Sequence, residues 1–501
     1  MCIRDRALRV GFHTMTDHTR GNSVDVLIVG AGLSGIGSAR HLQKNCPDRS
    51  FALLESRETL GGTWDLFRYP GIRSDSDMYT LGYSFKPWLE PKSIADGPSI
   101  LSYLRETARE TGVDSHIRYR HKVRSASWCS NTATWTVVAE RGDAGELVEL
   151  TCSFLLMCSG YYDFEQGYTP QFAGSSDFRG RVVHAQHWPQ DLDYKDKKVV
   201  VIGSGATAVT LVPELAREAA QTIMLQRSPT YIATIPSRDV LADRLRKWLP
   251  GSWVYRITRW RRVLFQIYVY KMSRRRPEAV KNYLLGLVRK ELGEDYDVDT
   301  HFTPDYNPWD QRLCAVPDGD MFACIREKRA EVVTDQIERF TDTGIRLGSG
   351  RNLQADIIVL ATGLNLKFMG GMAMDVDGKK IEPSDLFVYR GMMFANIPNL
   401  AQVLGYTNAS WTLKSDLTGD YVCRLLNHMR KSGARTVVPR LDEGRAVEEP
   451  IMDLNAGYVL RAAGKLPKQG KELPWRLYQN YILDFLNVRF TRLRDDVLEF
   501  S

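Results

Sequence analysis

The chain has 501 residues, of which 43% are hydrophobic and 25% charged, with 67 Lys and Arg against 60 Asp and Glu. This length accommodates two or three domains with a large core, in a composition typical of globular proteins. The net charge of +7 comes with no nucleic-acid-binding motif, so we expect no nucleic acid partner. The eight cysteines lack C-x-x-C spacing and predict reduced thiols in a cytoplasmic protein, and we expect no metal site.

Residues 1–22 are polar and lack the apolar core of a signal peptide. The opening MCIRDR resembles a translated sequencing adapter, so we expect the native start at Met15. We predict a disordered extension over residues 1–22.

The first structural signal is a Rossmann-type turn. Val24–Val29 is apolar and β-branched, as in a buried parallel strand, and helical spacing follows over residues 36–42. Between them, Gly30, Gly32 and Gly35 form a G-x-G-x-x-G turn, which permits close approach of the backbone to a pyrophosphate at a helix N-terminus. This unit predicts a dinucleotide site.

The next predicted strand, Phe51–Leu54, ends in Glu55, 20 residues after Gly35. An acid at this position hydrogen-bonds a ribose hydroxyl in dinucleotide-binding units. The loop that follows, GGTWDLFRYPGIRSD over residues 61–75, combines turn residues with two large aromatic residues and a carboxylate. Such a loop is typical of one that wraps a flat ligand.

Two apolar strands end in short polar turns. Phe154–Met157 leads to Cys158, Ser159 and Gly160, and Ile357–Leu360 leads to a similar turn over residues 361–363. We expect the chain to cross between domains at both places. Between these crossings stands FRGRVVHAQHWP, which has the spacing F-x-G-x-x-x-H-x-x-x-W-P.

A second dinucleotide unit follows that run. Lys198–Ile202 reads as a strand, residues 203–209 contain a G-x-G-x-x-A turn, and Ile223–Leu225 reads as the next strand. This strand leads to Arg227 and Ser228 instead of an acid. A guanidinium pairs with a 2'-phosphate that a carboxylate would repel, so the unit predicts NADPH.

Residues 244–276 alternate basic and bulky side chains and predict a helical insertion spanning about residues 241–296. Its apolar run is shorter than the roughly 20 residues that span a bilayer. Two interpretations remain open. We favour a helical cap over the substrate, and the alternative is a cationic helix lying on a membrane surface, which would make the protein membrane-associated.

The patterns together resemble Baeyer-Villiger flavin monooxygenases. The run from Phe178 to Pro189 matches that family's signature, and residues 61–75 match its fingerprint [A/G]-G-x-W followed by [F/Y]-P-[G/M]-x-x-x-D. The resemblance covers about residues 24–492 and is closest to members that also oxidise thioamide sulfur. It implies an α/β fold with two Rossmann-like dinucleotide-binding domains, for FAD and NADPH, and a helical insertion.

The resemblance also implies roles for individual residues. We expect FAD and NADPH to be bound by Gly30, Gly32, Ser34, Gly35, Glu55, Gly62, Thr63, Trp64, Asp65, Leu66, Arg73, Ser74, Asp75, Val123, Gly203, Ser204, Gly205, Ala206, Thr207, Ala208, Val209, Arg227 and Ser228. The signature residues, expected to act as a hinge, are Phe178, Gly180, His184, Trp188 and Pro189. Arg312 stands at the family's catalytic arginine, held by Asp75; a structural salt bridge with Asp310 or Asp318 is the alternative. Gln311 replaces a lysine common in the family, which weakens the predicted preference for NADPH.

The implied reaction uses NADPH and O2 and converts ketones into esters through a C4a-peroxyflavin, with oxygenation of thioamides or sulfides as a second reaction. Two alternatives remain: a monooxygenase acting mainly on sulfur or nitrogen, and an NADPH oxidase that does not oxygenate a substrate. The predicted FAD-binding domain comprises residues 23–165 and 363–501, and the predicted NADPH-binding domain comprises residues 166–362.

Overall fold

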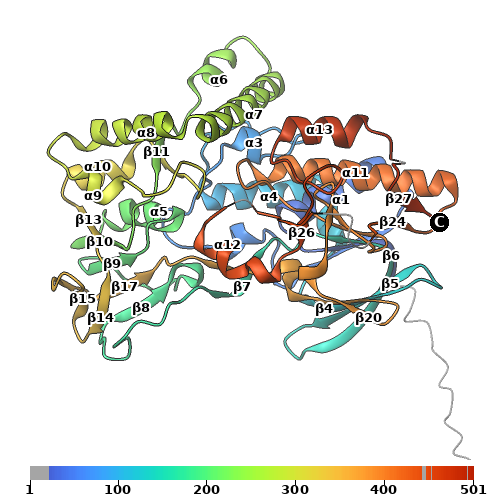
Figure 1. Cartoon of the computed structure of the whole chain (residues 1–501), viewed down its shortest axis with the longest axis horizontal. Helices are drawn as coiled ribbons and strands as arrows, with labels where there is room; N and C mark the ends of the chain where they lie inside the picture. Colours follow the sequence, from blue (N-terminus) through green and yellow to red (C-terminus); the bar gives the residue numbers. More distant parts are fainter. Residues whose placement is uncertain (1–21, 443–446, 453, 494) are drawn as a thin grey trace, which may run out of the picture.

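The computed structural model describes residues 22–442, 447–452, 454–493 and 495–501. Two β-sheets with parallel cores lie along the long axis of the molecule, flanked by helices, and further helices cross above them (Figure 1). This architecture confirms the predicted α/β fold with two Rossmann-like units and a helical insertion. Except for Asn22, the extension predicted for residues 1–22 lies outside the described residues.

The first sheet is built around β1 (Ser23–Val29), which pairs in parallel with β2 (Phe51–Leu54) and β6 (Glu146–Met157). At its edges, β3 (Ile117–Arg118) follows β2, and β23 (Leu400–Gln402) pairs with the end of β6. Both faces of such a sheet are covered, which explains why β1 and β2 are apolar and buried.

The long strand β6 belongs to two arrangements. Its first half pairs antiparallel with β5 (Thr134–Arg141), which pairs with β4 (His121–Cys129), while its second half lies in the parallel core. Two short strands, β19 (Ala373–Val376) and β20 (Lys379–Ile381), extend this meander. The meander is therefore continuous with the dinucleotide-type sheet.

The second sheet is parallel throughout, in the order β13-β10-β9-β17-β8. Its strands are β8 (Arg181–His184), β9 (Lys198–Ile202), β10 (Gln221–Gln226), β13 (Ala330–Thr334) and β17 (Ile357–Leu360). The two sheets are linked by β7 (Tyr162–Gly167) and β18 (Leu364–Leu366), which pair antiparallel where the chain leaves and re-enters the first sheet. The chain therefore crosses between the sheets at the two places predicted from the polar turns.

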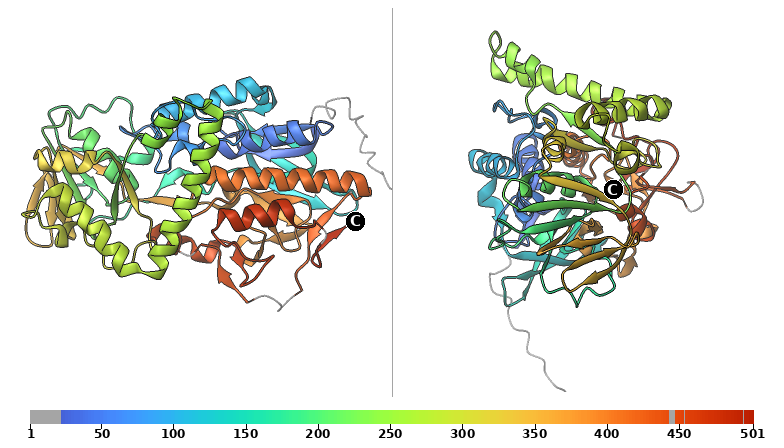
Figure 2. Two further views of the ribbon diagram at one scale, coloured as in Figure 1. Left: turned by 90° about the horizontal axis from the view of Figure 1, so that it is seen from above. Right: turned by 90° about the vertical axis from the view of Figure 1, so that its left-hand side faces the viewer.

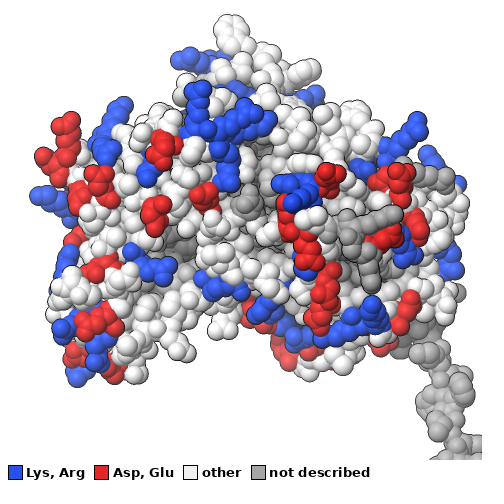
Figure 3. Space-filling view, in the orientation of Figure 1, with Lys and Arg blue, Asp and Glu red and all other residues white. Residues whose placement is uncertain are grey.

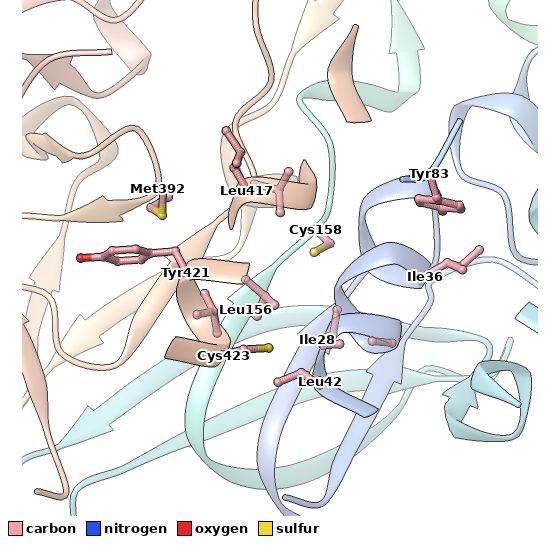
Figure 4. Close-up of a cluster of buried hydrophobic side chains, with 14 of the residues drawn as sticks. Ile28, Ile36, Leu42, Tyr83, Leu156, Cys158, Met392, Leu417, Tyr421 and Cys423 are labelled. Atoms are coloured by element: carbon pink, nitrogen blue, oxygen red, sulfur yellow. The ribbon is translucent and has the colours of Figure 1, made fainter. Parts of the chain in front are cut away.

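Helices pack on both sheets. The first sheet is covered by α1 (Leu33–Asn45), α4 (Gly97–Thr111) and α11 (Trp411–Ser432), and α5 (Ala206–Leu215) follows β9 in the second. Buried side chains from β1, α1, β6 and α11, among them Ile28, Leu42, Leu156 and Leu417, form a common core (Figure 4). This core fixes α1 and α11 over the sheet.

The insertion comprises α6 (Val240–Leu245), α7 (Gly251–Arg275) and α8 (Pro277–Leu292). Seen from above, α7 lies across the molecule beside α11 and α13 (Tyr481–Phe490) (Figure 2). Within the described residues, no helix combines the length and apolarity needed to cross a lipid bilayer.

The remaining elements connect these layers. The shorter helices are α2 (Thr63–Leu66), α3 (Met78–Leu81), α9 (Val298–Phe302), α10 (Asp320–Arg326) and α12 (Gly457–Ala462). The shorter strands are β11 (Ile232–Ile235), β12 (Cys314–Pro317), β14 (Ile337–Thr341), β15 (Gly344–Leu347), β16 (Asn352–Gln354), β21 (Val388–Tyr389), β22 (Met393–Phe394), β24 (Val437–Pro439), β25 (Glu449–Pro450), β26 (Lys468–Gln469) and β27 (Leu498–Phe500).

Candidate active site

A cavity of about 920 Å³ opens at the carboxyl ends of β1 and β2, where ligands bind in sheets of this type. Its volume lies near the upper end of the roughly 300–1,000 Å³ of small-molecule sites. Its walls come from the first Rossmann turn, the 61–75 loop, the turn after β6, α7, β11 and residues 406–411. Segments from both ends of the chain therefore close around one space.

The glycines of the first turn allow close packing of backbone and leave the start of α1 facing the cavity. Gly30 has φ +105°, and a Cβ there would lie 2.5 Å from the Cys158 carbonyl oxygen. A Cβ on Gly35 would lie 1.9 Å from the Gly30 carbonyl oxygen, so helix and turn pack too closely for any side chain. Gly32 caps α1 without a side-chain hydrogen bond and lines the cavity with Ser34, so the amides of the helix N-terminus are available to an anion.

Glu55 is buried at the end of β2 and lines the cavity. Its Oε2 accepts a hydrogen bond from the Ala31 amide at 2.8 Å, and its Oε1 accepts one from the Arg57 amide at 3.0 Å. Burial raises the pKa of Glu55, although these hydrogen bonds oppose the shift. The carboxylate therefore ties the turn to the strand end and retains acceptor capacity for a hydroxyl. Val123, on β4, lines the same cavity.

The 61–75 loop divides into two sets of predicted residues. Gly62, Thr63, Trp64, Ser74 and Asp75 line the cavity. The other three predicted contacts, Asp65, Leu66 and Arg73, do not line it.

The two charged members of the second set have protein partners. Asp65 is buried, and its Oδ2 accepts hydrogen bonds from Arg57 at 2.5 Å and from Thr59 at 2.6 Å. Arg73 pairs with Asp320, at the start of α10. Both residues therefore hold the loop in place from outside the cavity.

Arg312 lies in the cavity wall with its Nη1 3.5 Å from Asp75 Oδ2. Its Nε is buried and has no hydrogen-bond partner in the described part of the chain. Tyr161, followed by Asp75, raises the pKa of Arg312, so the guanidinium stays charged. The alternative partners lie elsewhere, since Asp310 pairs with Arg274 at 2.7 Å and Asp318 accepts from the Ser237 amide at 2.9 Å.

The second turn lies outside this cavity, and none of residues 203–209, 227 and 228 lines it. Gly203 has φ +140°, and Gly205 caps α5 without a side-chain hydrogen bond and with open space around it. Arg227 and Ser228 follow β10 and are exposed. An accessible helix N-terminus and an exposed arginine after the next strand suit a phosphorylated ligand.

Contacts join the second turn to the 61–75 loop. Tyr69 is buried in the same apolar cluster as Ala208 and Val212 of α5, and a Cβ on Gly71 would lie 3.2 Å from the carbonyl oxygen of Thr210. The loop that carries Asp75 therefore packs against α5, the helix that begins at the second turn.

The signature residues lie at the chain crossing and do not line the cavity. His184 is the last residue of β8. Its ring lies so close to Gly167 of β7 that a Cβ on this glycine would be 2.1 Å from His184 Cε1. Its Nδ1 accepts from the Gln186 amide at 3.1 Å, and burial lowers its pKa. Phe178 packs edge-on against Phe340.

The rest of the signature shapes the same region. A Cβ on Gly180 would lie 2.3 Å from the Asp356 carbonyl oxygen, so this position tolerates only glycine without rearrangement. Trp188, followed by Pro189, packs edge-on against Tyr194. These contacts place the signature against the second sheet and its neighbouring strands, outside the cavity walls.

The cavity also contains residues that sequence reasoning missed. Trp411, at the start of α11, donates from Nε1 to Ser34 Oγ at 2.8 Å and stacks on Tyr161 with ring centroids 5.0 Å apart. Phe265 and Val269 of α7 line the wall, together with Trp309. Only the Tyr161–Tyr162 pair gave a local signal, because two aromatic residues directly follow a strand-end turn.

The walls contain polar groups that lack protein partners. Buried Ser159 Oγ, Trp309 Nε1, Arg312 Nε and Asn408 Oδ1 have no hydrogen-bond partner among the described residues. Such groups are costly unless a ligand or water satisfies them. With the free helix N-terminus and Glu55, they fit the predicted FAD. No group of three or more His, Cys, Asp and Glu side chains suited to a metal occurs in the described part of the chain.

Comparison with known proteins agrees with this reading. Residues 83–431 match the family model described as flavin-binding monooxygenase-like, and residues 28–88 match that of an NAD(P)-binding Rossmann-like domain. The chain is similar to the FAD-containing monooxygenase EthA of Mycobacterium tuberculosis, with 54% identity over 97% of this chain and 98% of that protein. The corresponding protein of Mycolicibacterium smegmatis is 49% identical, over 97% of this chain and 98% of its own length.

Solved structures share the fold. An oxidised steroid monooxygenase bound to NADP has a TM-score of 0.69 at 23% identity, over 83% of this chain and 87% of its own. An open form of cyclohexanone monooxygenase has a TM-score of 0.69 at 20% identity, over 83% of this chain and 90% of its own.

Proposed function

Because this chain belongs to the flavin-binding monooxygenase-like family, we propose that it is a Baeyer-Villiger monooxygenase that uses FAD, NADPH and O2 to convert ketones into esters. Thioamide or sulfide sulfur is the second substrate class. The coarser assignment, a flavin-dependent monooxygenase, follows from family membership alone. The more specific assignment, a Baeyer-Villiger monooxygenase, rests on the signature run over residues 178–189 and on the charged Arg312 in the cavity wall.

FAD would be held by the first turn and its surroundings. The amides at the start of α1 would bind the pyrophosphate, Glu55 a ribose hydroxyl, and the Val123 backbone the adenine. Trp64 and Thr63 would border the ring system. The bound flavin, reduced by NADPH, would supply the activation of O2.

The single observation that carries the proposal is Arg312. The charged guanidinium pairs with Asp75 in the cavity wall, and its buried Nε has no hydrogen-bond partner in the described structure. It is therefore a fixed donor for an oxygen atom that gains negative charge. Such preorganised charge stabilises a transition state without reorganisation during the reaction. Asp75 would hold the guanidinium in orientation, since its carboxylate lies 3.5 Å away.

NADPH would bind at the second turn. Arg227 and Ser228 stand exposed beyond β10 and would contact the 2'-phosphate. The contacts of Tyr69 and Gly71 with α5 support a nicotinamide that reaches the loop carrying Asp75. The FAD-binding domain would comprise residues 23–165 and 363–501, the NADPH-binding domain residues 166–362, and the signature residues would act as the hinge between them.

The test is product analysis with the FAD-loaded protein, NADPH and ¹⁸O2. A long-chain methyl ketone should give an ester that contains one ¹⁸O atom, with one NADPH oxidised and the second oxygen atom released as water. A thioamide is supplied in a parallel reaction. A labelled S-oxide without any ester would assign the chain to sulfur oxygenation, and unlabelled substrate with stoichiometric hydrogen peroxide would assign it to the oxidase class.

A further inference from the structure

The outward side of α7 is apolar. Trp253, Ile257, Trp260, Leu264 and Tyr268 recur at intervals of three or four residues, so they share one face of the helix. Their exposed fractions lie between 38% and 60%. A helix that packs on a globular core normally turns its apolar stripe inward.

The inward side of α7 combines apolar residues, among them Val254 and Val263, with arginines. Arg259 is buried and donates to the carbonyl oxygens of Tyr79 and Gly82, both at 2.7 Å. Arg262 donates to the Asp239 carboxylate at 2.5 Å. The helix is therefore held on its inner side by buried apolar residues together with these polar contacts, while the five residues of the outer stripe stay more than a third exposed.

Neighbouring segments extend the stripe. Trp260 packs edge-on against Phe485 of α13, with ring centroids 5.5 Å apart. On that helix Leu483, Leu486 and Phe490 share an exposed face at intervals of three and four residues. At the other end Trp248, between α6 and α7, is 85% exposed. We call these residues and the α7 stripe the apolar outer face; contiguous exposed patches of this kind mark interaction sites.

The surroundings of this face are basic. Residues 240–276 contain eleven Lys and Arg and a single acid, Asp243. Figure 3 shows white and blue atoms over the protruding tip formed by α6 and α7. Exposed cations around the face include Arg244, Lys247, Lys271 and Arg275, none of which has an ion pair within the described residues. This charge is complementary to a surface of anionic headgroups.

The same helix borders the cavity. Phe265 lines the cavity wall and is 55% exposed, one position from Leu264 of the outer face. Val269, one position beyond Tyr268, also lines the wall. The cavity therefore lies directly behind the apolar outer face.

We propose that the apolar outer face docks on an anionic lipid bilayer, with its aromatic and leucine side chains in the interface and its cations against the headgroups. Apolar side chains supply the burial and the surrounding cations supply the attraction and orientation. In this position α7 lies between the lipid and the cavity, so the active site is held next to apolar substrates dissolved in the membrane.

The test is flotation of the full-length, FAD-loaded protein with vesicles of equal parts phosphatidylglycerol and phosphatidylcholine, and with pure phosphatidylcholine vesicles. The protein should float with the anionic vesicles and at least tenfold less with the neutral ones. Ile257→Glu combined with Leu264→Glu should reduce the partition at least tenfold. Lys271→Glu combined with Arg275→Glu should do the same, since each cation contributes about fivefold.

The matched control is Leu147→Glu, an exposed leucine of β6 that lies outside the apolar outer face. This control should float like the parent, and retained FAD shows that each variant is folded. Absence of flotation with anionic vesicles, or flotation unchanged by Ile257→Glu/Leu264→Glu, would overturn the proposal. So would a dimer that those substitutions dissolve without any vesicle binding, because the face would then belong to a second copy. The readout requires no turnover, so it is independent of the proposed reaction.

Discussion

A positive charge fixed in a cavity wall has a measurable consequence at Arg312. Arg312→Ala removes the guanidinium that pairs with Asp75 and should lower product formation by about a hundredfold or more, the loss seen when one transition-state donor is removed. NADPH oxidation should persist and yield hydrogen peroxide, because neither the first nor the second turn contains this residue. The measurement compares product, peroxide and NADPH consumption.

Arg326→Ala is the control for that experiment. Arg326 is exposed, pairs with Glu291 at 2.9 Å and does not line the cavity. Its removal should leave all three quantities unchanged. If Arg312→Ala formed product at the parental rate, the guanidinium would have no part in the reaction.

Arg227 should determine the preference of the protein for NADPH over NADH. Arg227→Ala removes a charge-assisted hydrogen bond to the 2'-phosphate and should raise the KM for NADPH about tenfold to a hundredfold. The KM for NADH should stay the same, because NADH lacks that phosphate. Arg217→Ala, an exposed arginine of the same region paired with Glu214, is the control. Equal effects on NADPH and NADH would remove Arg227 from the phosphate site, and Gln311→Lys should strengthen the preference for NADPH.

For individual residues, the sequence predicts those positions around the cavity that depend on local spacing along the chain. Gly30, Gly32 and Glu55 belong to one turn and one strand end, so their arrangement around the cavity follows from the chain itself. Trp411 was missed because its contact with Ser34 spans 377 residues, and no pattern encodes that distance. Arg73 belongs to a matching fingerprint, yet its side chain pairs with Asp320 outside the cavity, a choice that only packing determines.

Among the elements, α1 and α11 are joined by a buried histidine. His41 lies 3.2 Å from Asp416 and 3.0 Å from Asp420. Burial alone would lower its pKa, but the hydrogen bonds and charges of the two carboxylates outweigh this and raise it from 6.5 to about 9. The protonated ring therefore stabilises the contact between the helices.

The stabilisation should depend on pH in one direction. Because the pKa of His41 is raised in the folded state, its protonation contributes fully to the free energy of unfolding below pH 6.5. This contribution declines as the pH rises and is lost through about pH 9. His41→Gln should therefore destabilise the protein by about 3 kcal/mol at pH 6 and much less at pH 9.5. Denaturant unfolding of both proteins across this range measures the difference. An exposed control, His187→Gln, should show no such trend, and a constant difference for His41→Gln would refute the assignment.

Elements were predictable where apolar runs are continuous. The predicted strands 51–54, 198–202 and 357–360 coincide with β2, β9 and β17, because buried parallel strands are apolar throughout. The first half of β6 was not predicted, since its alternation of buried and exposed residues is interrupted by charges. The orientation of α7 could not be predicted either, because apolar and basic residues occur around the whole helix.

For the whole molecule, the cavity predicts a strong dependence of stability on the flavin. Its walls come from distant segments and contain unpaired buried groups, so a ligand that fills it links them. At a free FAD concentration a hundredfold above the dissociation constant, binding should add about 2.7 kcal/mol to the free energy of unfolding. Removal of FAD should lower the Tm, and reloading should restore it. An identical Tm with and without FAD would show that the cofactor does not bind in the native state.

The contact between α1 and α11 can form only late in the synthesis of the chain. His41 and Asp416 are 375 residues apart, so at about 5–20 residues per second the ribosome needs about 20–75 s after making one to deliver the other. During that interval the first Rossmann unit lacks the helix that covers it. Its apolar surface is exposed and accessible to chaperones and to other nascent chains. Premature termination before α11 would therefore release an aggregation-prone fragment rather than a weakened enzyme.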